Sequence, residues 1–351
     1  MDKRIFILVG IFLALLACNV GASTSTPTTD LFATLSASTP KPANPLDTQP
    51  AQTATSFSLA TPVLLTEAVS TPSSKDQPTG RIVFTCQLFR VQASNQICII
   101  NADGTGYRRL TTDDNKQHYY PSLSPDGRSV VYAAFREANF YEIYEMDLAT
   151  GSVVQLTNKL GNLNSPEISP DGNNIIFKTW SPNTDKNVLW KMDRDGKNAD
   201  KISRVVGWDP TWSPDGKYVL FASDMEGAIK LFRMGINGKD LHRVSDLPSM
   251  RGRSDWSPDG QFIVTYSGEA WHREVYIMNV DGSNARVVSP TGGNSQGPSF
   301  SPDGRWITFT SYYDHPEDDH GCEIYIVRVD GTDLRRLTNN DYCDYQPRWG
   351  P

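Results

Sequence analysis

The chain has 351 residues, with 33 Lys and Arg against 40 Asp and Glu, so its net charge is −7. The sequence shows no basic stripe, which disfavours nucleic-acid binding. Once the polar N-terminal stretch is set aside, the remaining length suffices for one large domain with its own core.

The N-terminus has the pattern of an export signal. Lys3 and Arg4 precede an apolar run from Ile5 to Ala17, which is too short to span a bilayer but typical of a signal peptide. The Leu-Leu-Ala-Cys run that ends at Cys18 resembles a bacterial lipobox. That resemblance implies a lipoprotein signal peptide over 1–17, a lipidated Cys18 and attachment to a bacterial membrane. The alternative is an ordinary signal peptide followed by a cysteine without a special role.

Residues 18–79 comprise this cysteine and a stretch rich in Thr, Ser, Pro and Ala, with few aromatic residues. Such a composition cannot bury a core, so it predicts a disordered tether. A flexible chain of this length spans about 40–50 Å. The tether is either a plain spacer or a site of O-glycosylation.

From residue 80 onward the sequence is repetitive. Ser-Pro-Asp-Gly begins at five positions with gaps of 45, 44, 44 and 44 residues: Ser124, Ser169, Ser213, Ser257 and Ser301. Proline, aspartate and glycine in this order favour a tight turn between two strands. A period in the forties is typical of repeated β-blades.

Each repeat predicts four strands. The segment after the turn is rich in β-branched and aromatic residues, a third strand follows, and a second Asp-Gly or Asn-Gly turn leads to a short fourth strand. At the start of the domain, 80–87 matches a second strand that lacks its first, and 346–351 supplies the missing one. We therefore predict an all-β fold over 80–351, a six-bladed β-propeller whose C-terminal strand closes the first blade.

The P-x-[aromatic]-S-P-D-G repeat resembles the WD40-like repeat of TolB-type propellers, over about 80–351. The resemblance implies a β-propeller fold and a function in binding a partner. TolB-type proteins also have an N-terminal α/β domain, whereas the predicted tether occupies that position in this sequence. We therefore do not expect this chain to have their role in the Tol machinery. A GxGxxG motif and a P-loop are missing from the sequence.

Four cysteines remain besides Cys18. An even number in an exported chain suggests two disulfides, and strand positions pair Cys86 with Cys98 and Cys322 with Cys343. Both would brace the seam where the ring closes. The alternative is four free thiols.

Blade topology sorts the connections onto two faces. The turn face has the Ser-Pro-Asp-Gly turns and the second turns, and the variable face has the loops between second and third strands and the blade-to-blade connections. The variable face gathers aromatic residues and arginines, a composition typical of recognition surfaces. The predicted ligand-binding face comprises His118, Tyr120, Arg136, Trp208, Asp209, Arg253, Trp271, His272 and Tyr345. Alternatively, several of these aromatic residues pack between blades.

The loop at 314–320 combines two histidines with four carboxylates. Asp314, His315 and His320 are therefore candidate ligands for a divalent cation, although such charge runs usually form solvated loops. Apart from this cation, we expect no cofactor.

Two functions are consistent with the sequence. The first is an extracytoplasmic, membrane-tethered binding or scaffold propeller that recognises a protein, peptide or glycan. The second is a surface carbohydrate-active lyase or hydrolase, whose site at the channel mouth would need Asp209, His118, His272 and the 314–320 loop to converge.

Overall fold

The computed structural model describes residues 76–351 except 90–93, 138–139, 182–185 and 251. The predicted signal peptide, Cys18 and almost all of the predicted tether lie outside the described residues, so their predictions stay untested. The side chains of 136–137, 181 and 186 are also outside the described part. In the part described, no helix is long and apolar enough to cross a membrane.

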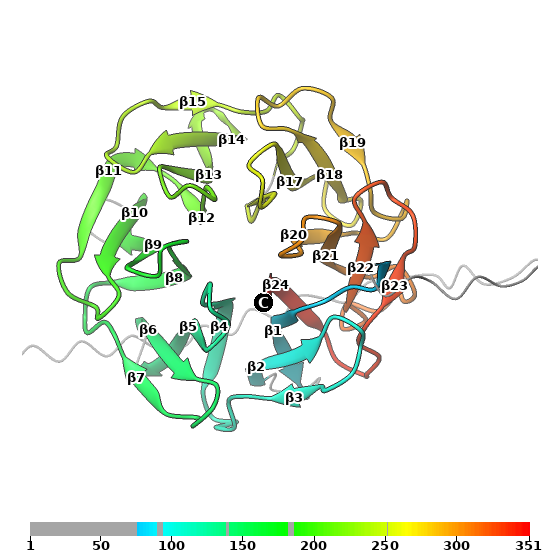
Figure 1. Ribbon diagram of the computed structural model, residues 1–351, viewed down its shortest axis with the longest axis horizontal. Coiled ribbons are helices and arrows are strands. Elements are labelled where there is room, and N and C mark those ends of the chain that lie inside the picture. Colours follow the sequence, from blue (N-terminus) through cyan, green and yellow to red (C-terminus); the bar gives the residue numbers. More distant parts are fainter. Residues whose placement is uncertain (1–75, 90–93, 138–139, 182–185, 251) are drawn as a thin grey trace, which may run out of the picture. The chain divides into compact units, whose positions relative to one another are not determined.

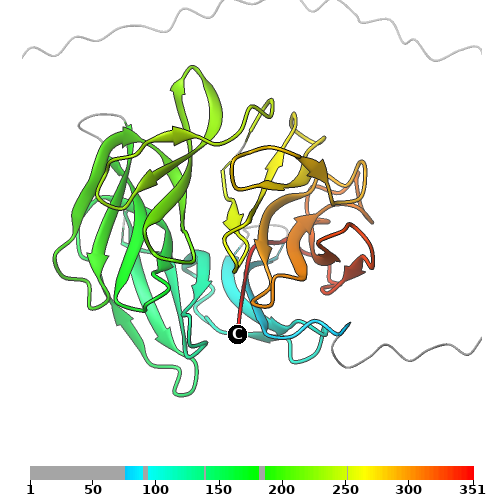
Figure 2. The same ribbon diagram turned by 45° about the horizontal axis from the view of Figure 1, so that its top comes forward.

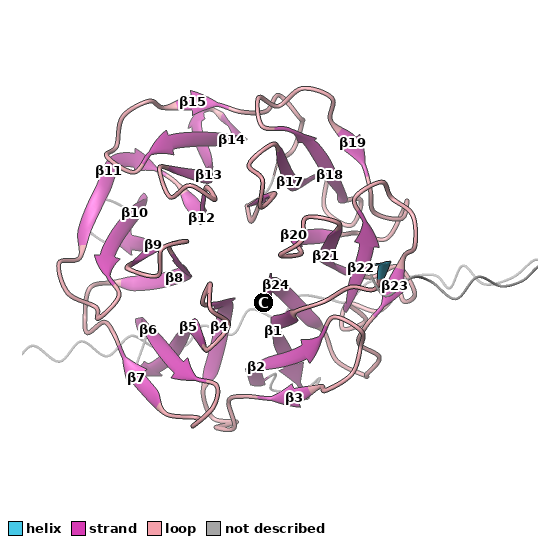
Figure 3. Ribbon diagram, in the orientation of Figure 1, coloured by secondary structure: helices cyan, strands magenta, loops and turns pink. Residues whose placement is uncertain are grey.

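The described residues form six four-stranded antiparallel sheets arranged as a ring of blades (Figure 1). Figure 2 shows the same ring tilted, and Figure 3 shows that strands and loops make up almost all of it. We number the blades so that blade 1 contains β24, β1, β2 and β3, and blades 2 to 6 follow in chain order. The predicted six-bladed β-propeller is confirmed.

Every blade contributes one strand to each of four concentric positions. The innermost strands are β24 (Asp344–Gly350), β4 (Gln117–Leu123), β8 (Asn162–Ile168), β12 (Trp208–Trp212), β16 (Asp255–Trp256) and β20 (Gln296–Phe300). The second strands are β1 (Arg81–Leu88), β5 (Ser129–Glu137), β9 (Asn174–Ser181), β13 (Tyr218–Glu226), β17 (Phe262–Ser267) and β21 (Trp306–Ser311). The third strands are β2 (Ser94–Asn101), β6 (Phe140–Asp147), β10 (Lys186–Asp193), β14 (Ala228–Gly235), β18 (Glu274–Asn279) and β22 (Glu323–Arg328). The outer strands are β3 (Arg108–Arg109), β7 (Val153–Gln155), β11 (Asp200–Val206), β15 (His242–Arg243), β19 (Arg286–Val287) and β23 (Arg335–Arg336).

Blade 1 is the composite blade that the sequence predicts. Strand β24 pairs with β1 from Gly350 opposite Arg81 to Asp344 opposite Cys86, and the C-terminus lies at the centre of the ring (Figure 1). The last strand of the chain therefore completes the first blade, and the closed ring leaves no innermost strand missing.

The repeated turn is held by its own side chains. In the first copy, Ser124 Oγ donates to Asp126 Oδ1 over 2.6 Å and accepts from the backbone N of Ser129 over 3.0 Å. Asp126 Oδ1 also accepts from the backbone N of Arg128, and Gly127 takes φ +67°, which favours glycine. The hydrogen bond from Ser124 is the main reason that the pKa of Asp126 is lowered. The aspartate is thus a turn residue and needs no catalytic role.

The core consists of apolar layers between neighbouring blades. Between blades 6 and 1, for example, Trp306 and Ile326 pack with Phe84 and Ile100. The three tryptophans predicted as core, Trp212, Trp256 and Trp306, are only 6%, 6% and 0% exposed, which confirms that prediction.

Both predicted disulfides form, with Cα–Cα distances of 5.8 Å for Cys86–Cys98 and 4.5 Å for Cys322–Cys343. The first joins β1 to β2 inside blade 1. The second joins the residue before β22 in blade 6 to the residue before β24. Each is typically worth about 2–4 kcal/mol. Disulfides of this kind fit a location outside the cytoplasm.

The chain joins the propeller on the turn face. Arg81 begins β1 there, and three residues before it already contact the ring. Arg328 Nη2 donates to the carbonyl of Asp76 over 3.0 Å, Arg335 Nη1 to Gln77 Oε1 over 3.1 Å, and Trp349 Nε1 to the carbonyl of Thr79 over 2.8 Å. Residues 76–79, assigned to the linker from sequence, therefore lie against blades 6 and 1.

Candidate functional site

The inner strands share a kink at the residue that precedes proline. In five blades this residue has a left-handed backbone: φ is +61° at Gly297 and, at the four residues that are not glycine, +54° at Tyr120, +52° at Ser165, +51° at Asp209 and +57° at Gln346. The strand pairing shifts register at the same point, which marks a β-bulge. A left-handed conformation is unfavourable for such residues, and surrounding contacts must hold it.

The kinked residues supply those contacts to one another across blade boundaries. Gln346 Oε1 of blade 1 accepts from the backbone N of Tyr120 in blade 2 over 2.9 Å. Asp209 Oδ1 in blade 4 accepts from Ser165 Oγ of blade 3 over 2.7 Å, and its Oδ2 accepts from the backbone N of Arg253 over 3.2 Å. The predicted site residues Tyr120, Asp209 and Arg253 therefore lie together around the axis.

Two buried arginines close the centre of the ring. Arg253, just before β16 of blade 5, is 7% exposed, and its Nη2 donates over 3.0 Å to the carbonyl of Pro121 in blade 2, on the opposite side. Arg348 of β24 is 6% exposed and pairs with Glu167 of blade 3 over 3.0 Å and Asp255 of blade 5 over 3.3 Å. Since these contacts join non-adjacent blades, the side chains cross the axis.

Burial dominates the electrostatics of this centre. It raises the pKa of Glu167 against the opposing effect of Arg348. It also lowers the pKa of Arg253 to about 9, reinforced by the positive charge of Arg348. Arg253 Nη1 is buried without a hydrogen-bond partner, although the guanidinium lies 5.8 Å from the Tyr120 ring centre. The centre is thus a packed ionic plug.

A tyrosine-lined pocket of about 230 Å³ opens on the variable face beside this plug. Tyr119 and Tyr120 of β4, Tyr141 of β6 and Tyr345 of β24 line it, together with the amides of Asn164 and Gln346. Tyr119 lies 5.7 Å from Tyr141, ring centre to ring centre. The hydroxyls of Tyr119 and Tyr345 are both bound by Asn95, over 2.8 and 2.7 Å. Blades 1, 2 and 3 therefore contribute to one aromatic pocket.

The aromatic surface continues on the far side of Tyr345. Burial raises the pKa of Tyr345, and neighbouring Tyr119, Tyr120, Tyr141 and Tyr312 add to this shift. Tyr312 in turn contacts Trp271 edge to face, with ring centres 5.3 Å apart. We call the set Tyr119, Tyr120, Tyr141, Tyr345, Tyr312 and Trp271 the aromatic arc.

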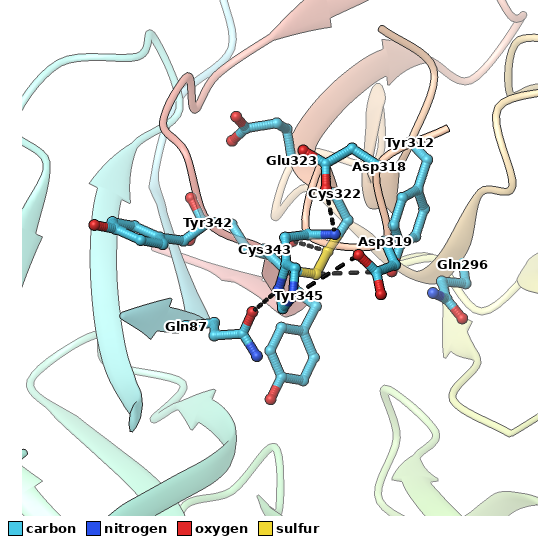
Figure 4. The surroundings of a disulfide bond; sticks show 12 residues. Gln87, Gln296, Tyr312, Asp318, Asp319, Cys322, Glu323, Tyr342, Cys343 and Tyr345 are labelled. Carbon is cyan, nitrogen blue, oxygen red and sulfur yellow. Dashed lines mark hydrogen bonds and ion pairs between the residues drawn. A yellow bond between two sulfur atoms is a disulfide. The ribbon is translucent and has the colours of Figure 1, made fainter. Parts of the chain in front are cut away.

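The second disulfide supports the middle of the arc (Figure 4). Tyr312 Oη lies 3.8 Å from Cys343 Sγ, and the backbone N of Asp344 donates to the carbonyl of Cys322 over 2.7 Å. Gln87 N donates to the carbonyl of Cys343 over 2.9 Å. The segment that leads into Tyr345 is thus fastened to blades 6 and 1 together.

The other predicted face residues are placed differently. His118 is 1% exposed and packs against the Tyr132 ring at 5.7 Å, so it belongs to the interior and not to the surface. Trp271 is 51% exposed, and His272 next to it is exposed with Nδ1 3.2 Å from the carbonyl of Ala270. Trp208 is half-buried at the start of β12. The side chain of Arg136 lies outside the described residues.

The residues of the acidic loop are engaged separately. Asp314 accepts from Tyr325 Oη over 2.6 Å and pairs with Arg336 over 3.1 Å, while His320 Nδ1 lies 2.8 Å from Gln87 Oε1. His315 is exposed, with Nε2 3.5 Å from Arg336 Nη1. Within the described ranges, no group of three or more His, Cys, Asp and Glu side chains could hold a metal ion.

Sequence reasoning missed several members of this site. Glu167, Asp255 and Arg348 occupy the same repeat position, two residues after the kink, where the other blades have Ser or Thr. A charged residue at a repeat position that is Ser or Thr in the other blades is the sequence feature that could have identified them. The Tyr119, Tyr141, Asn164 and Gln346 side chains have no such signal, because they meet only after the ring closes.

These features define a six-bladed β-propeller that is closed at its centre by side chains and presents an aromatic variable face. The chain belongs to the PD40 family, described as the TolB beta propeller domain, whose model matches residues 73–351.

Individual relatives agree with this assignment. An uncharacterized protein of Agrobacterium fabrum is 33% identical over 154 residues, 40% of this chain and 50% of that protein. The Tol-Pal system protein TolB of Francisella tularensis is 28% identical over 145 residues, 40% of this chain and 33% of that protein. The chain thus matches half or less of each of these relatives. The crystal structure of TolB from Acinetobacter baumannii has a TM-score of 0.68 at 24% identity, covering 78% of this chain and 67% of that one.

Proposed function

We propose that this chain is an extracytoplasmic binding propeller that recognises a protein or peptide through the aromatic arc. The observation that carries the proposal is the combination of an ionic plug at the centre with exposed and half-buried aromatic side chains beside it. Tyr and Trp supply large contact areas with little conformational entropy to lose, and they dominate binding energy at interfaces. The relatives named Tol-Pal system proteins support a partner in the bacterial envelope.

Within the described part of the chain, the titratable groups predicted for the lyase or hydrolase alternative do not converge. Asp209 is held by Ser165 and Arg253, His118 is buried, and His272 contacts its own loop. Asp314 is bound by Tyr325 and Arg336 in blade 6. Because general acid-base chemistry needs two such groups at one substrate position, these separate contacts favour binding over catalysis.

Replacing Trp271 by Ala is expected to weaken binding by tenfold or more, because truncation of an exposed aromatic anchor typically costs about 2 kcal/mol or more. The full chain is panned against a random-peptide library and, in parallel, applied to a glycan array. The affinities of the selected ligands are then measured by calorimetry. The matched control is Phe262→Ala, which removes an aromatic side chain of 37% exposure next to a turn-face loop.

Equal affinity of the two variants for every ligand would contradict recognition through the arc. If only glycans are selected and their binding is weakened by Trp271→Ala, the aromatic arc is still the binding surface. The ligand is then a sugar and not a peptide.

We also propose that lipidated Cys18 holds the propeller on a membrane. Since the chain joins the ring on the turn face, the point of attachment lies on the face opposite the aromatic arc. Cys18→Ser is expected to abolish incorporation of a labelled fatty acid and to shift the protein from the membrane to the soluble fraction, with Ser23→Ala as the control. A Cys18→Ser protein that stays labelled and membrane-bound would refute this anchor.

A further inference from the structure

A second cavity, of about 350 Å³, lies between blades 6 and 1 and shares no lining residue with the tyrosine pocket. Leu88 and Ile100 of blade 1 and Leu337 of blade 6 give it apolar walls. Tyr107, Tyr342 and Asp344 add hydroxyl and carboxyl groups. The cavity therefore combines an apolar body with an acidic group.

Asp344 is the unusual member of this lining. Its side chain is 1% exposed; Oδ2 accepts from Asn340 Nδ2 over 2.8 Å, whereas Oδ1 is buried without a hydrogen-bond partner. Burial, with a further contribution from Glu323, raises the pKa of Asp344 to about 8. A buried carboxyl without a positive partner is costly to ionise.

The cations nearby are already paired. Arg336 of β23 donates to buried Glu323 over 2.8 Å and pairs with Asp314 over 3.1 Å. Arg109 of β3 pairs with Asp114. Tyr107 itself responds to the excess of negative charge, because burial, Asp344 and Glu323 together raise its pKa to about 12.

His320 also lies beside the cavity, because its Nδ1 is 2.8 Å from Oε1 of Gln87 on the cavity wall. Acidic groups around the cavity thus outnumber the cations that face them. Asp344 in particular is left without a positive partner.

We propose that this cavity binds an alkylammonium group carried on an apolar stem, with the ammonium against Asp344 and the stem along Leu88, Ile100 and Leu337. The ammonium supplies the cation and the hydrogen-bond donors that Asp344 Oδ1 lacks, and the stem covers the apolar walls. Two sources have this chemistry: the side chain of a lysine in a partner protein, and a free small amine. The inference is independent of the aromatic arc.

Proton linkage gives the site a distinctive signature. A bound ammonium favours the ionised form of Asp344, so binding below pH 8 releases a proton. The affinity should therefore rise between pH 6 and pH 8, by up to about tenfold per pH unit. An amine stays protonated through this range, because an alkylammonium group resembling that of lysine has a pKa of about 10.4.

Calorimetry with the full chain tests the proposal with matched probes. The free probes are 1-aminopentane and 1-pentanol, and the peptide probes are acetyl-Gly-Lys-Gly-amide and its norleucine counterpart. At pH 8.5 each amine is expected to bind at least tenfold more tightly than its neutral partner. At pH 7, two buffers of different ionisation enthalpy should report the release of a proton.

Asp344→Asn is expected to abolish both the preference for amines and the proton release, whereas Asp319→Asn, an exposed carboxylate in the neighbouring loop, should preserve them. Leu88→Trp, which fills the cavity, should weaken amine and alcohol alike. Tighter binding of the lysine peptide than of 1-aminopentane identifies a protein partner, and the reverse identifies a free amine. Equal binding of amines and neutral probes by the wild type overturns the proposal.

Stability measurements show whether Asp344→Asn is folded. Since the pKa of Asp344 in the folded state lies above its unfolded value of 3.8, the wild type loses stability as the pH rises from about 4 to about 8. Asn cannot ionise, so the variant should lack this loss and melt at least as high as the wild type at pH 8. A variant that melts lower at pH 8 would contradict the unpaired acid on which the site depends.

Discussion

Removal of residues 346–351 is expected to abolish cooperative folding of the propeller, because these residues form most of the innermost strand of blade 1. Loss of buried Trp349 alone costs about 3–5 kcal/mol, by analogy with large-to-small substitutions in cores. Loss of Arg348 leaves Glu167 and Asp255 buried without their cation, for about 3–5 kcal/mol more. The sum is comparable to the whole stability of a typical domain, about 5–15 kcal/mol.

Thermal unfolding of the chain that lacks 346–351, followed by circular dichroism, measures this effect. The control removes only exposed Pro351, whose carbonyl accepts hydrogen bonds from Arg81 on the surface. That control should melt within a few degrees of the wild type. A chain without 346–351 that melts at the wild-type temperature would disprove closure of the ring through β24.

Arg348→Met is expected to be the most damaging single substitution at the centre of the ring. Methionine fills similar space but provides no charge, so Glu167 and Asp255, whose side chains are only 16% and 18% exposed, are left without their cation. Breaking a buried ion pair in this way costs about 3–5 kcal/mol. The free energy of unfolding, measured by urea titration at pH 7.5, should fall by that amount, whereas exposed Arg128→Ala should change it by less than about 0.5 kcal/mol.

The pH dependence separates lost charge pairing from lost packing. Without Arg348 the pKa of Glu167 in the folded state should rise further, so the defect should shrink as the pH falls toward 5 and Glu167 binds a proton. The triple variant with Glu167→Gln and Asp255→Asn should recover most of the lost stability at pH 7.5. If Arg348→Met loses the same unfolding free energy at pH 5 and at pH 7.5, and the triple variant does not recover it, then Arg348 stabilises the ring by packing and not by its charge.

The fold was predictable because its information is local and repeated. Each Ser-Pro-Asp-Gly turn contains its own hydrogen-bonding partners, so five copies at a fixed interval determine strand order and blade number. The composite blade could be predicted for the same reason, since β1 and β24 each match one half of the repeat. The disulfides followed from strand positions alone.

The site was only partly predictable because its contacts join positions that the repeat does not relate. Tyr120, Asp209 and Arg253 were identified as unusual residues on the variable face, yet Arg253 points across the axis to Pro121. His118 was misplaced, because a histidine at the start of an inner strand can face the neighbouring core as readily as solvent. Asp344 gave no signal, since its raised pKa arises from burial between two blades that are distant in the sequence.

The pairing of the first and last strands, β1 and β24, in blade 1 has a mechanical consequence. The polypeptide reaches β1 from the turn face at Arg81, while Tyr345 of the aromatic arc is the second residue of β24, at the variable face. A load applied between these points pulls the two antiparallel strands lengthwise past each other. The hydrogen bonds from Arg81–Gly350 to Cys86–Asp344 then share the force together instead of opening one by one. The Cys322–Cys343 bridge lies at the loaded end of β24, so the seam that closes the ring is also built to resist shear.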